Sequence, residues 1–126
     1  MLPAAHRMRR RADFTAAVRA GRRASSSSLV LHIVPRPDRD DPAKVGLIVS
    51  KGVGGSVVRH QVARRLRAVC AGSLDRFADG DLVVIRALPQ AAMASSAELA
   101  DDLEHAAERL GRRAESPVES VATGSK

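Results

Sequence analysis

Residues 51–67 read KGVGGSVVRHQVARRLR, a glycine-rich turn followed by a helix that carries four arginines. The glycines predict a sharp change of chain direction just before the helix. We expect Ser56 to be the N-cap, because a serine hydroxyl can accept from an unpaired first-turn amide. One face of the helix is predicted to be buried, because apolar residues recur every three or four positions, at Val58, Val62, Leu66 and Val69.

Basic side chains gather on one flank of this helix when residues are placed about 100° apart. The predicted basic ridge consists of Arg59, His60, Arg64 and Arg67, whereas Arg65 lies on the opposite side. Ala63 stands in the middle of the ridge, where its small side chain would let a phosphate backbone approach. Residues 51–74 contain no Asp or Glu, although a solvated helix usually mixes acids with bases. The pattern therefore favours a polyanion-binding helix over the alternative, a solvated face.

The turn before the helix leaves two interpretations open. A helix N-terminus offers free amides and the positive end of a dipole, so one phosphate can bind there beside Lys51. The other interpretation is a purely structural strand-to-helix turn. A nucleotide-binding phosphate loop is excluded, because Lys51 precedes the glycines instead of following them.

The charge of the whole chain points to nucleic acid as the partner. The net charge is +7 over 126 residues, but residues 1–76 carry +11 and residues 77–126 carry −4. A basic region of this size attracts polyanions, and an anionic membrane is the competing partner. No segment combines basic residues with the bulky apolar face that membrane surfaces favour, and no apolar run approaches a membrane span. We expect a cytoplasmic protein without a membrane partner or a small-molecule substrate.

The remaining segments predict a small α/β sandwich, with helices against one sheet. An extended basic arm at 6–12 precedes a helix at 14–20, capped by Asp13 and ended by Gly21. Strands are expected at 29–34, 44–50 and 82–88, with a further short strand possible within 22–28.

The pairing and the ends of these elements follow from composition. The first two of the three main strands should form an antiparallel hairpin, and the third, which is the most apolar, should be central. The arginine helix should extend to about residue 76. A capping box at 95–98 opens a last helix with an acidic outer face, and a disordered tail is expected at 114–126.

No group of residues suggests a protein active site. The acids lie in turns or on the exposed face of the last helix, and the four histidines are scattered. The single cysteine, Cys70, falls on the buried stripe and is predicted to be core. A protein-only nuclease is disfavoured because it would need a carboxylate cluster for its metal.

Three segments together resemble a known family, the protein component of bacterial ribonuclease P. They are the opening MLPAAHRMRRRADF, the Gly-Arg-Arg of residues 21–23, and the central KVGLIVSKGVGGSVVRHQVARRLR of residues 44–67. The resemblance covers residues 1–113, which we expect to form one domain. Gly52, His60 and Gln61 stand where the family usually has Lys, Asn and Arg, so this ridge carries less charge than is typical.

The resemblance implies an αβββαβα two-layer sandwich similar to the second domain of ribosomal protein S5. A left-handed βαβ crossover, which is rare in proteins, would pass through the arginine helix. It also implies the auxiliary subunit of an endoribonuclease that removes the 5′ leader of precursor tRNA. The partners would be ribonuclease P RNA, which is the catalyst and holds most of the Mg²⁺, and precursor tRNA. The residue pattern alone leaves open a generic RNA-binding or ribosome-associated module.

The resemblance also assigns residues to two surfaces, with no catalytic or metal-binding residue on the protein. The catalytic-RNA surface would comprise Arg59, His60, Arg64, Arg65 and Arg67. The leader surface would comprise Phe14, Val18, His32, Lys51, Arg10 and Arg11. From the residues alone, Phe14 is a core residue and His32 is a partly exposed residue on an open sheet face.

Overall fold

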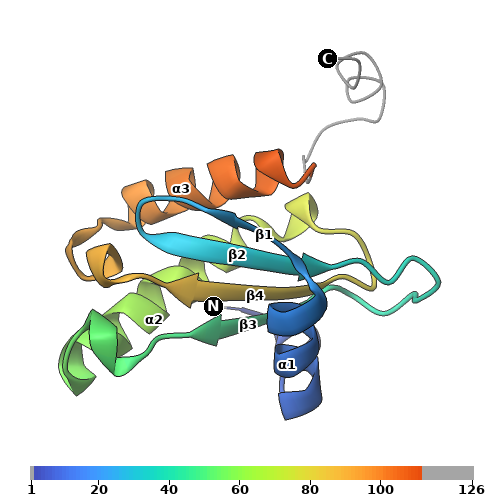
Figure 1. The fold of residues 1–126 in the computed structure, drawn as a ribbon, viewed down its shortest axis with the longest axis horizontal. Coiled ribbons are helices and arrows are strands. Elements are labelled where there is room, and N and C mark those ends of the chain that lie inside the picture. The colour runs from blue at the N-terminus through green and yellow to red at the C-terminus, as the bar shows by residue number, and fades with distance from the viewer. Residues whose placement is uncertain (1, 112–126) are drawn as a thin grey trace.

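The computed structural model describes residues 2–111, which form an α+β fold with one mixed sheet and helices on both of its faces (Figure 1). The helices and strands, in chain order, are α1 (Arg11–Ala20), β1 (Arg22–Ser25), β2 (Leu29–Val34), β3 (Lys44–Ile48), α2 (Ser56–Ala71), β4 (Leu82–Ala87) and α3 (Ser96–Arg109). Short 3-10 turns, η1 to η4, lie at Ala4–His6, Lys51–Val53, Leu74–Arg76 and Pro89–Met93. The αβββαβα order is confirmed, and the tail predicted at 114–126 lies outside the described residues.

The strand order in the sheet is β1-β2-β4-β3. β4 is central, as its continuous apolar sequence predicted, and pairs antiparallel with β2 and parallel with β3. The parallel pair is joined through α2. In Figure 1 both strands point the same way, β4 lies above β3 and α2 lies behind the sheet, so this crossover is left-handed.

The predicted hairpin between strands 29–34 and 44–50 is wrong, because β4 lies between them. The connection from β2 to β3 does not form a hairpin turn but passes around the turn that precedes β4. Arg36 Nε donates to the Gly80 carbonyl at 2.7 Å, and the Gly80 amide donates to the Asp41 carbonyl at 2.7 Å. Gly80 has φ +86°, and a Cβ there would lie 2.3 Å from the Arg36 carbonyl oxygen, so glycine is required.

The N-terminal segment is shorter and more tightly held than the predicted basic arm. Leu2 and Met8 are buried, and the Met8 amide donates to the Val45 carbonyl on the outer edge of β3. α1 begins at Arg11, so Asp13 lies in its first turn and is not its cap. The Asp13 carboxylate still lies near the positive end of the helix dipole. The short strand expected within 22–28 is present as β1, at the other edge of the sheet.

The ends of α2 also differ from prediction. Its N-cap is Gly55, and Ser56 is the first helical residue without a side-chain capping bond. The helix ends at Ala71, and the segment to residue 76 forms the separate turn η3. The capping box at α3 is confirmed, with reciprocal bonds of 2.8 and 3.1 Å between Ser95 and Glu98.

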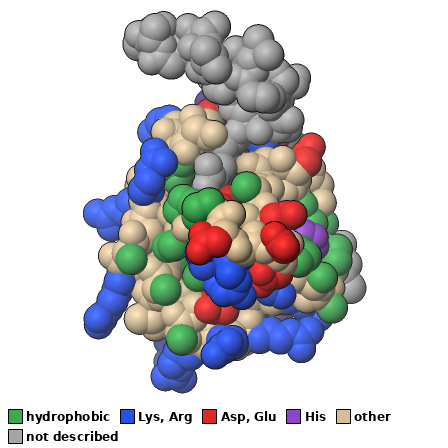
Figure 2. Space-filling model, turned by 90° about the vertical axis from the view of Figure 1, so that its right-hand side faces the viewer, with side chains coloured by type: hydrophobic (Ala, Val, Ile, Leu, Met, Phe, Trp, Pro, Cys, Tyr) green, Lys and Arg blue, Asp and Glu red, His purple; other side chains and the backbone are tan. Residues whose placement is uncertain are grey.

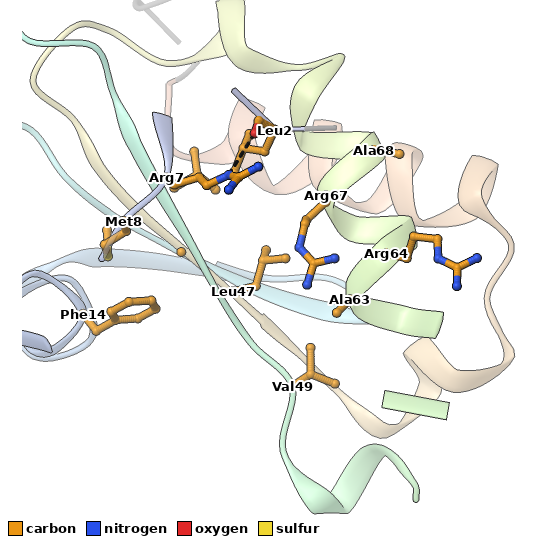
Figure 3. Close-up of a pocket in the computed structure, with 12 residues that line it drawn as sticks. Leu2, Arg7, Met8, Phe14, Leu47, Val49, Ala63, Arg64, Arg67 and Ala68 are labelled. Atoms are coloured by element: carbon orange, nitrogen blue, oxygen red, sulfur yellow. Dashed lines mark hydrogen bonds between the residues drawn. The ribbon is translucent and has the colours of Figure 1, made fainter. Parts of the chain in front are cut away.

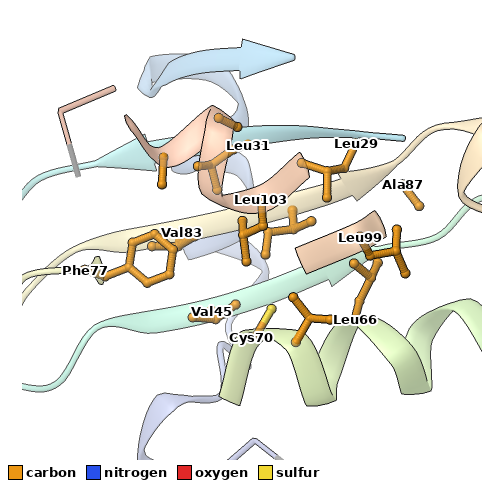
Figure 4. Close-up of a cluster of buried hydrophobic side chains, with 14 of the residues drawn as sticks. Leu29, Leu31, Val45, Leu66, Cys70, Phe77, Val83, Ala87, Leu99 and Leu103 are labelled. Atoms are coloured by element: carbon orange, nitrogen blue, oxygen red, sulfur yellow. The ribbon is translucent and has the colours of Figure 1, made fainter. Parts of the chain in front are cut away.

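The core lies in two parts, one on each face of the sheet. The larger part packs alternate residues of β2 and β4 against α2 and α3 (Figure 4), through residues such as Leu31, Leu66 and Leu103. The smaller part packs α1 against the other face, through Ala17, Leu82 and Val84. The two-layer prediction is therefore confirmed for α2 and α3, while α1 adds partial cover on the opposite side.

The loop between β1 and β2 is held to α3 by the half-buried carboxylate of Asp102. The Ser28 amide and hydroxyl both donate to Asp102 Oδ2, at 3.1 and 2.5 Å. Asp102→Ala is expected to lower the free energy of unfolding by about 1–3 kcal/mol, because it leaves the buried Ser28 donors without an acceptor. Urea denaturation measures this change. Asp101→Ala, at an exposed neighbour, should change it by less than about 0.5 kcal/mol, and equal losses would contradict the prediction.

Candidate RNA interface

The basic ridge predicted on α2 is present. His60, Arg64 and Arg67 are exposed, and Arg59 is half-buried because its Nε donates to the Gly54 carbonyl at 3.2 Å. Arg59, His60 and Arg67 surround a hollow of about 220 Å³ with Ala63 at its base. The alanine thus leaves a space among the cations that a phosphate can enter.

Arg65 lies on the other flank of α2, as the helical wheel predicted. Its Nη1 donates to the Ala94 carbonyl at 3.2 Å, which ties α2 to the end of η4. The geometry therefore gives Arg65 a structural contact and places it apart from the ridge residues with which the family resemblance grouped it on the catalytic-RNA surface.

A second hollow, of about 700 Å³, runs between the N-terminal segment, β3 and α2 (Figure 3). We call it the β3–α2 groove. Its floor is apolar and includes Leu47 and Val49, whereas guanidinium groups stand on both rims. Arg64 and Arg67 belong to the α2 rim. Arg7 belongs to the opposite rim, where its Nε donates to the Leu2 carbonyl at 3.1 Å and leaves its terminal nitrogens free for a ligand.

Phe14 stands at the end of this groove farthest from α2, with Leu47 between it and the arginines (Figure 3). Its ring rests on Gly46 of β3, so closely that a Cβ at Gly46 would lie 2.4 Å from the ring. The ring is half-buried and joins the smaller core while still lining the groove. The groove therefore connects a residue predicted to touch the leader with residues predicted to touch the catalytic RNA.

The other predicted leader residues do not line the groove. Val18 is half-buried in the smaller core. His32 faces opposite to Leu31 and Ile33, as predicted, but it is 1% exposed and so is not the partly exposed residue that was expected. Burial, followed by the charges of Arg86 and Arg23, lowers the pKa of His32, so the ring is neutral at pH 7.

Lys51, Arg10 and Arg11 are exposed cations outside the groove. Lys51 begins η2, while the two arginines lie at the start of α1. Figure 2 shows Lys and Arg side chains along the left margin of the molecule, which is the side of the sheet that carries α1. Asp and Glu side chains gather near the centre of that view. Basic groups therefore lie on the α1 side of the sheet as well as on the ridge of α2.

Residues 2–111 contain no cluster of three or more His, Cys, Asp or Glu that could hold a metal ion. Burial raises the pKa of the Cys70 thiol to about 12, and Cys70 lies in the larger core, as predicted. None of the described helices is long and apolar enough to cross a membrane.

Sequence reasoning missed several residues that the fold brings to these surfaces. Leu2, Arg7 and Met8 line the groove because the N-terminal segment pairs with the edge of β3. Arg86 was overlooked although it is the lone charged residue in the apolar run of β4. A single charge in an apolar strand was sufficient to predict where Arg86 points, because a charged side chain in a central strand must point toward an uncovered part of the sheet.

A family model described as Ribonuclease P matches residues 2–111, the whole described part of the chain. The chain belongs to the ribonuclease P protein family. By family it is a component of an endoribonuclease complex with a role in tRNA 5′ processing.

Curated relatives agree with this assignment. Ribonuclease P protein components from a Nocardioides species and from Streptomyces bikiniensis are each 48% identical to this chain. The first alignment covers 88% of this chain and 96% of the relative, and the second covers 87% and 95%.

Solved ribonuclease P proteins share the fold. The Staphylococcus aureus protein superposes with a TM-score of 0.74 at 20% identity, covering 86% of this chain and 97% of that one. The Thermotoga maritima protein gives 0.66 at 17% identity, covering 77% and 90%. The family resemblance found in the sequence is therefore confirmed by both sequence and fold.

Proposed function

We propose that this protein binds ribonuclease P RNA and the 5′ leader of precursor tRNA, and so assists Mg²⁺-dependent removal of the leader. The observation that carries the proposal is the β3–α2 groove. It joins the arginine ridge of α2 to Phe14 through one continuous surface with an apolar floor and cationic rims. Such a surface can hold one RNA by its phosphates and a second RNA strand by both phosphates and bases.

The protein's role in this proposal is electrostatic and positional. A catalytic RNA and an RNA substrate repel each other, and cations placed between them reduce this electrostatic repulsion. Mg²⁺ would be held mainly by the RNA, since residues 2–111 offer no clustered ligands for it. When bound there it would supply charge stabilisation and an activated water for phosphodiester hydrolysis.

Reconstitution tests the proposal. The full chain, the organism's ribonuclease P RNA and a precursor tRNA are combined at a low Mg²⁺ concentration at which the RNA alone is inactive. We expect cleavage at the mature 5′ end only when protein and RNA are both present. The control is the same mixture at high Mg²⁺, where the RNA alone should become active. Absence of any enhancement by the protein at low Mg²⁺ would reject the proposal.

A generic RNA-binding module is the alternative function. It would bind the same RNAs through the same cations, so binding data alone do not separate the two. Comparing the affinities for precursor and mature tRNA does separate the two functions. We expect the reconstituted complex to bind precursor tRNA more tightly than mature tRNA, and equal affinities would favour the generic module.

A further inference from the structure

Two hollows meet at Ala63 of α2. The β3–α2 groove, of about 700 Å³, and the hollow of about 220 Å³ within the ridge are both lined by Val49, Ala63 and Arg67. Figure 3 shows Ala63 and Arg67 on the side of α2 that faces Leu47 and Val49. The side chain of Ala63 ends at its Cβ atom, so it leaves the space beside Arg67 open. Arg67 therefore borders both hollows, and a ligand in either one comes within its reach.

The lining of these hollows is apolar at the base and cationic at the rims. Leu47, Val49 and Ala63 are only half-buried, so apolar surface is left in contact with water. Among the described residues, no Asp or Glu lines either hollow. Arg64 and Arg67 are exposed, and no ion pair found among residues 2–111 involves them. A ligand that fits must therefore bring both an apolar surface and negative charge.

A nucleotide of unpaired RNA combines these two properties. Its base has an apolar face that can pack on aliphatic side chains or on a guanidinium plane, and a phosphate flanks it on each side. Bases within a duplex are already stacked on one another, so a duplex would offer this surface only its phosphates. Phosphates alone would leave Leu47 and Val49 without an apolar contact. The lining therefore favours a base that projects from its strand over the backbone of a duplex.

We propose that the α2 end of the β3–α2 groove binds one unpaired purine base of ribonuclease P RNA. The base lies on Leu47, Val49 and Ala63, and its flanking phosphates meet the cationic rims. Arg7 supplies one rim and Arg67 the other. The floor carries no hydrogen-bonding side chain, so it selects a base by the area of its ring, and a purine has the larger area. The pocket rests on the proposed function, which brings this RNA to α2 and leaves the leader to the opposite end of the groove.

A lysine at position 63 gives opposite results for a base pocket and for a purely electrostatic ridge. Ala63→Lys adds a charge but fills the space beside Arg67, so we expect binding to ribonuclease P RNA to weaken about tenfold. Gln61→Lys is the matched control, because Gln61 is exposed on the same helix and lines neither hollow. It adds the same charge and should tighten binding by up to about threefold. Unchanged or tighter binding by Ala63→Lys would overturn the pocket.

A pair of short ligands shows whether the protein binds the base or only the phosphates. Binding of an oligodeoxyadenylate and of an abasic oligonucleotide of the same length to the full chain is measured by fluorescence anisotropy. The two ligands carry equal charge, and we expect the adenylate to bind about tenfold more tightly. Ala63→Lys should reduce this preference to less than about threefold without weakening abasic binding. Equal affinity for the two ligands, or a preference that Ala63→Lys leaves unchanged, would overturn the proposal.

A measurement on the unaltered protein avoids any folding defect of the lysine variant. An aromatic base shifts the NMR signals of methyl groups that lie against its face, so the methyl signals of Leu47, Val49 and Ala63 should move with the oligodeoxyadenylate and not with the abasic ligand. Val57 is the control, since it is exposed on α2 outside both hollows and its signals should stay in place. Equal shifts of the groove methyl groups with the two ligands would overturn the pocket.

The two experiments with short ligands do not need ribonuclease P RNA, so they separate the pocket from the proposed function. A base preference that depends on Ala63, found without reconstituted cleavage, would reject only the proposed function. Reconstituted cleavage without that base preference would reject only the pocket.

Discussion

Replacing Arg64 and Arg67 together by alanine is expected to weaken binding to ribonuclease P RNA by about a hundredfold. Both side chains are exposed on the rim that the β3–α2 groove shares with the ridge of α2. A charge-assisted contact to phosphate contributes roughly 1.4 kcal/mol, which is about tenfold in affinity, and two such contacts are lost. The loss should be largest at low salt. The slope of log affinity against log salt should fall by about 1.5 to 2, because two fewer counterions are released.

The control removes the same charge from elsewhere. Arg39 and Arg109 are exposed and lie outside the groove, and Arg39 is already paired with Asp41 at 2.8 Å. Their double alanine variant also lowers the net charge by two, so it measures the general electrostatic effect. We expect it to weaken RNA binding by less than about fivefold. If both double variants lose affinity and slope equally, the α2 ridge is a solvated face and the groove is not the docking surface.

The helices and most strands were predictable because the residue patterns that indicate them lie within each element. The stripe at Val62, Leu66 and Val69 placed α2 against the core, and the apolar run at 82–88 placed β4 at the centre of the sheet. The strand order was not predictable in this way, and the expected pairing of β2 with β3 was wrong. A central strand is hydrogen-bonded along both of its edges. Here β4 takes this central place between β2 and β3, which are consecutive strands in the sequence.

The part of the candidate site that lies on a single helix was predicted, whereas the part formed by several elements was missed. The ridge around Ala63 belongs to a single helix, so the helical periodicity of the sequence was sufficient to predict it. The groove needs Arg7 beside Val45. This contact depends on strand register, which residue patterns leave undetermined until the pairing is known.

A second large effect is expected at Gly46, where β3 passes beneath Phe14. A Cβ at Gly46 would lie 2.4 Å from Phe14 Cε1 and 3.0 Å from Met8 Sδ. Gly46→Ala should therefore lower the free energy of unfolding by about 1–3 kcal/mol, because the ring and the N-terminal segment must both move. Gly52→Ala is the control, since the nearest atom to a Cβ there is the Ser50 hydroxyl oxygen at 3.7 Å. It should change stability by less than about 0.5 kcal/mol.

The cause of that loss is tested by combining Gly46→Ala with Phe14→Ala. If the methyl group acts by displacing the ring, it costs less once the ring is absent, so the two losses are not additive. Urea unfolding of the four proteins should give a coupling energy of about 1 kcal/mol or more. Additive losses would mean that Gly46 is needed for another reason and that the ring can leave the strand freely. Non-additive losses would mean that the contact between Gly46 and Phe14 fixes the ring at the end of the groove, where the leader is proposed to bind.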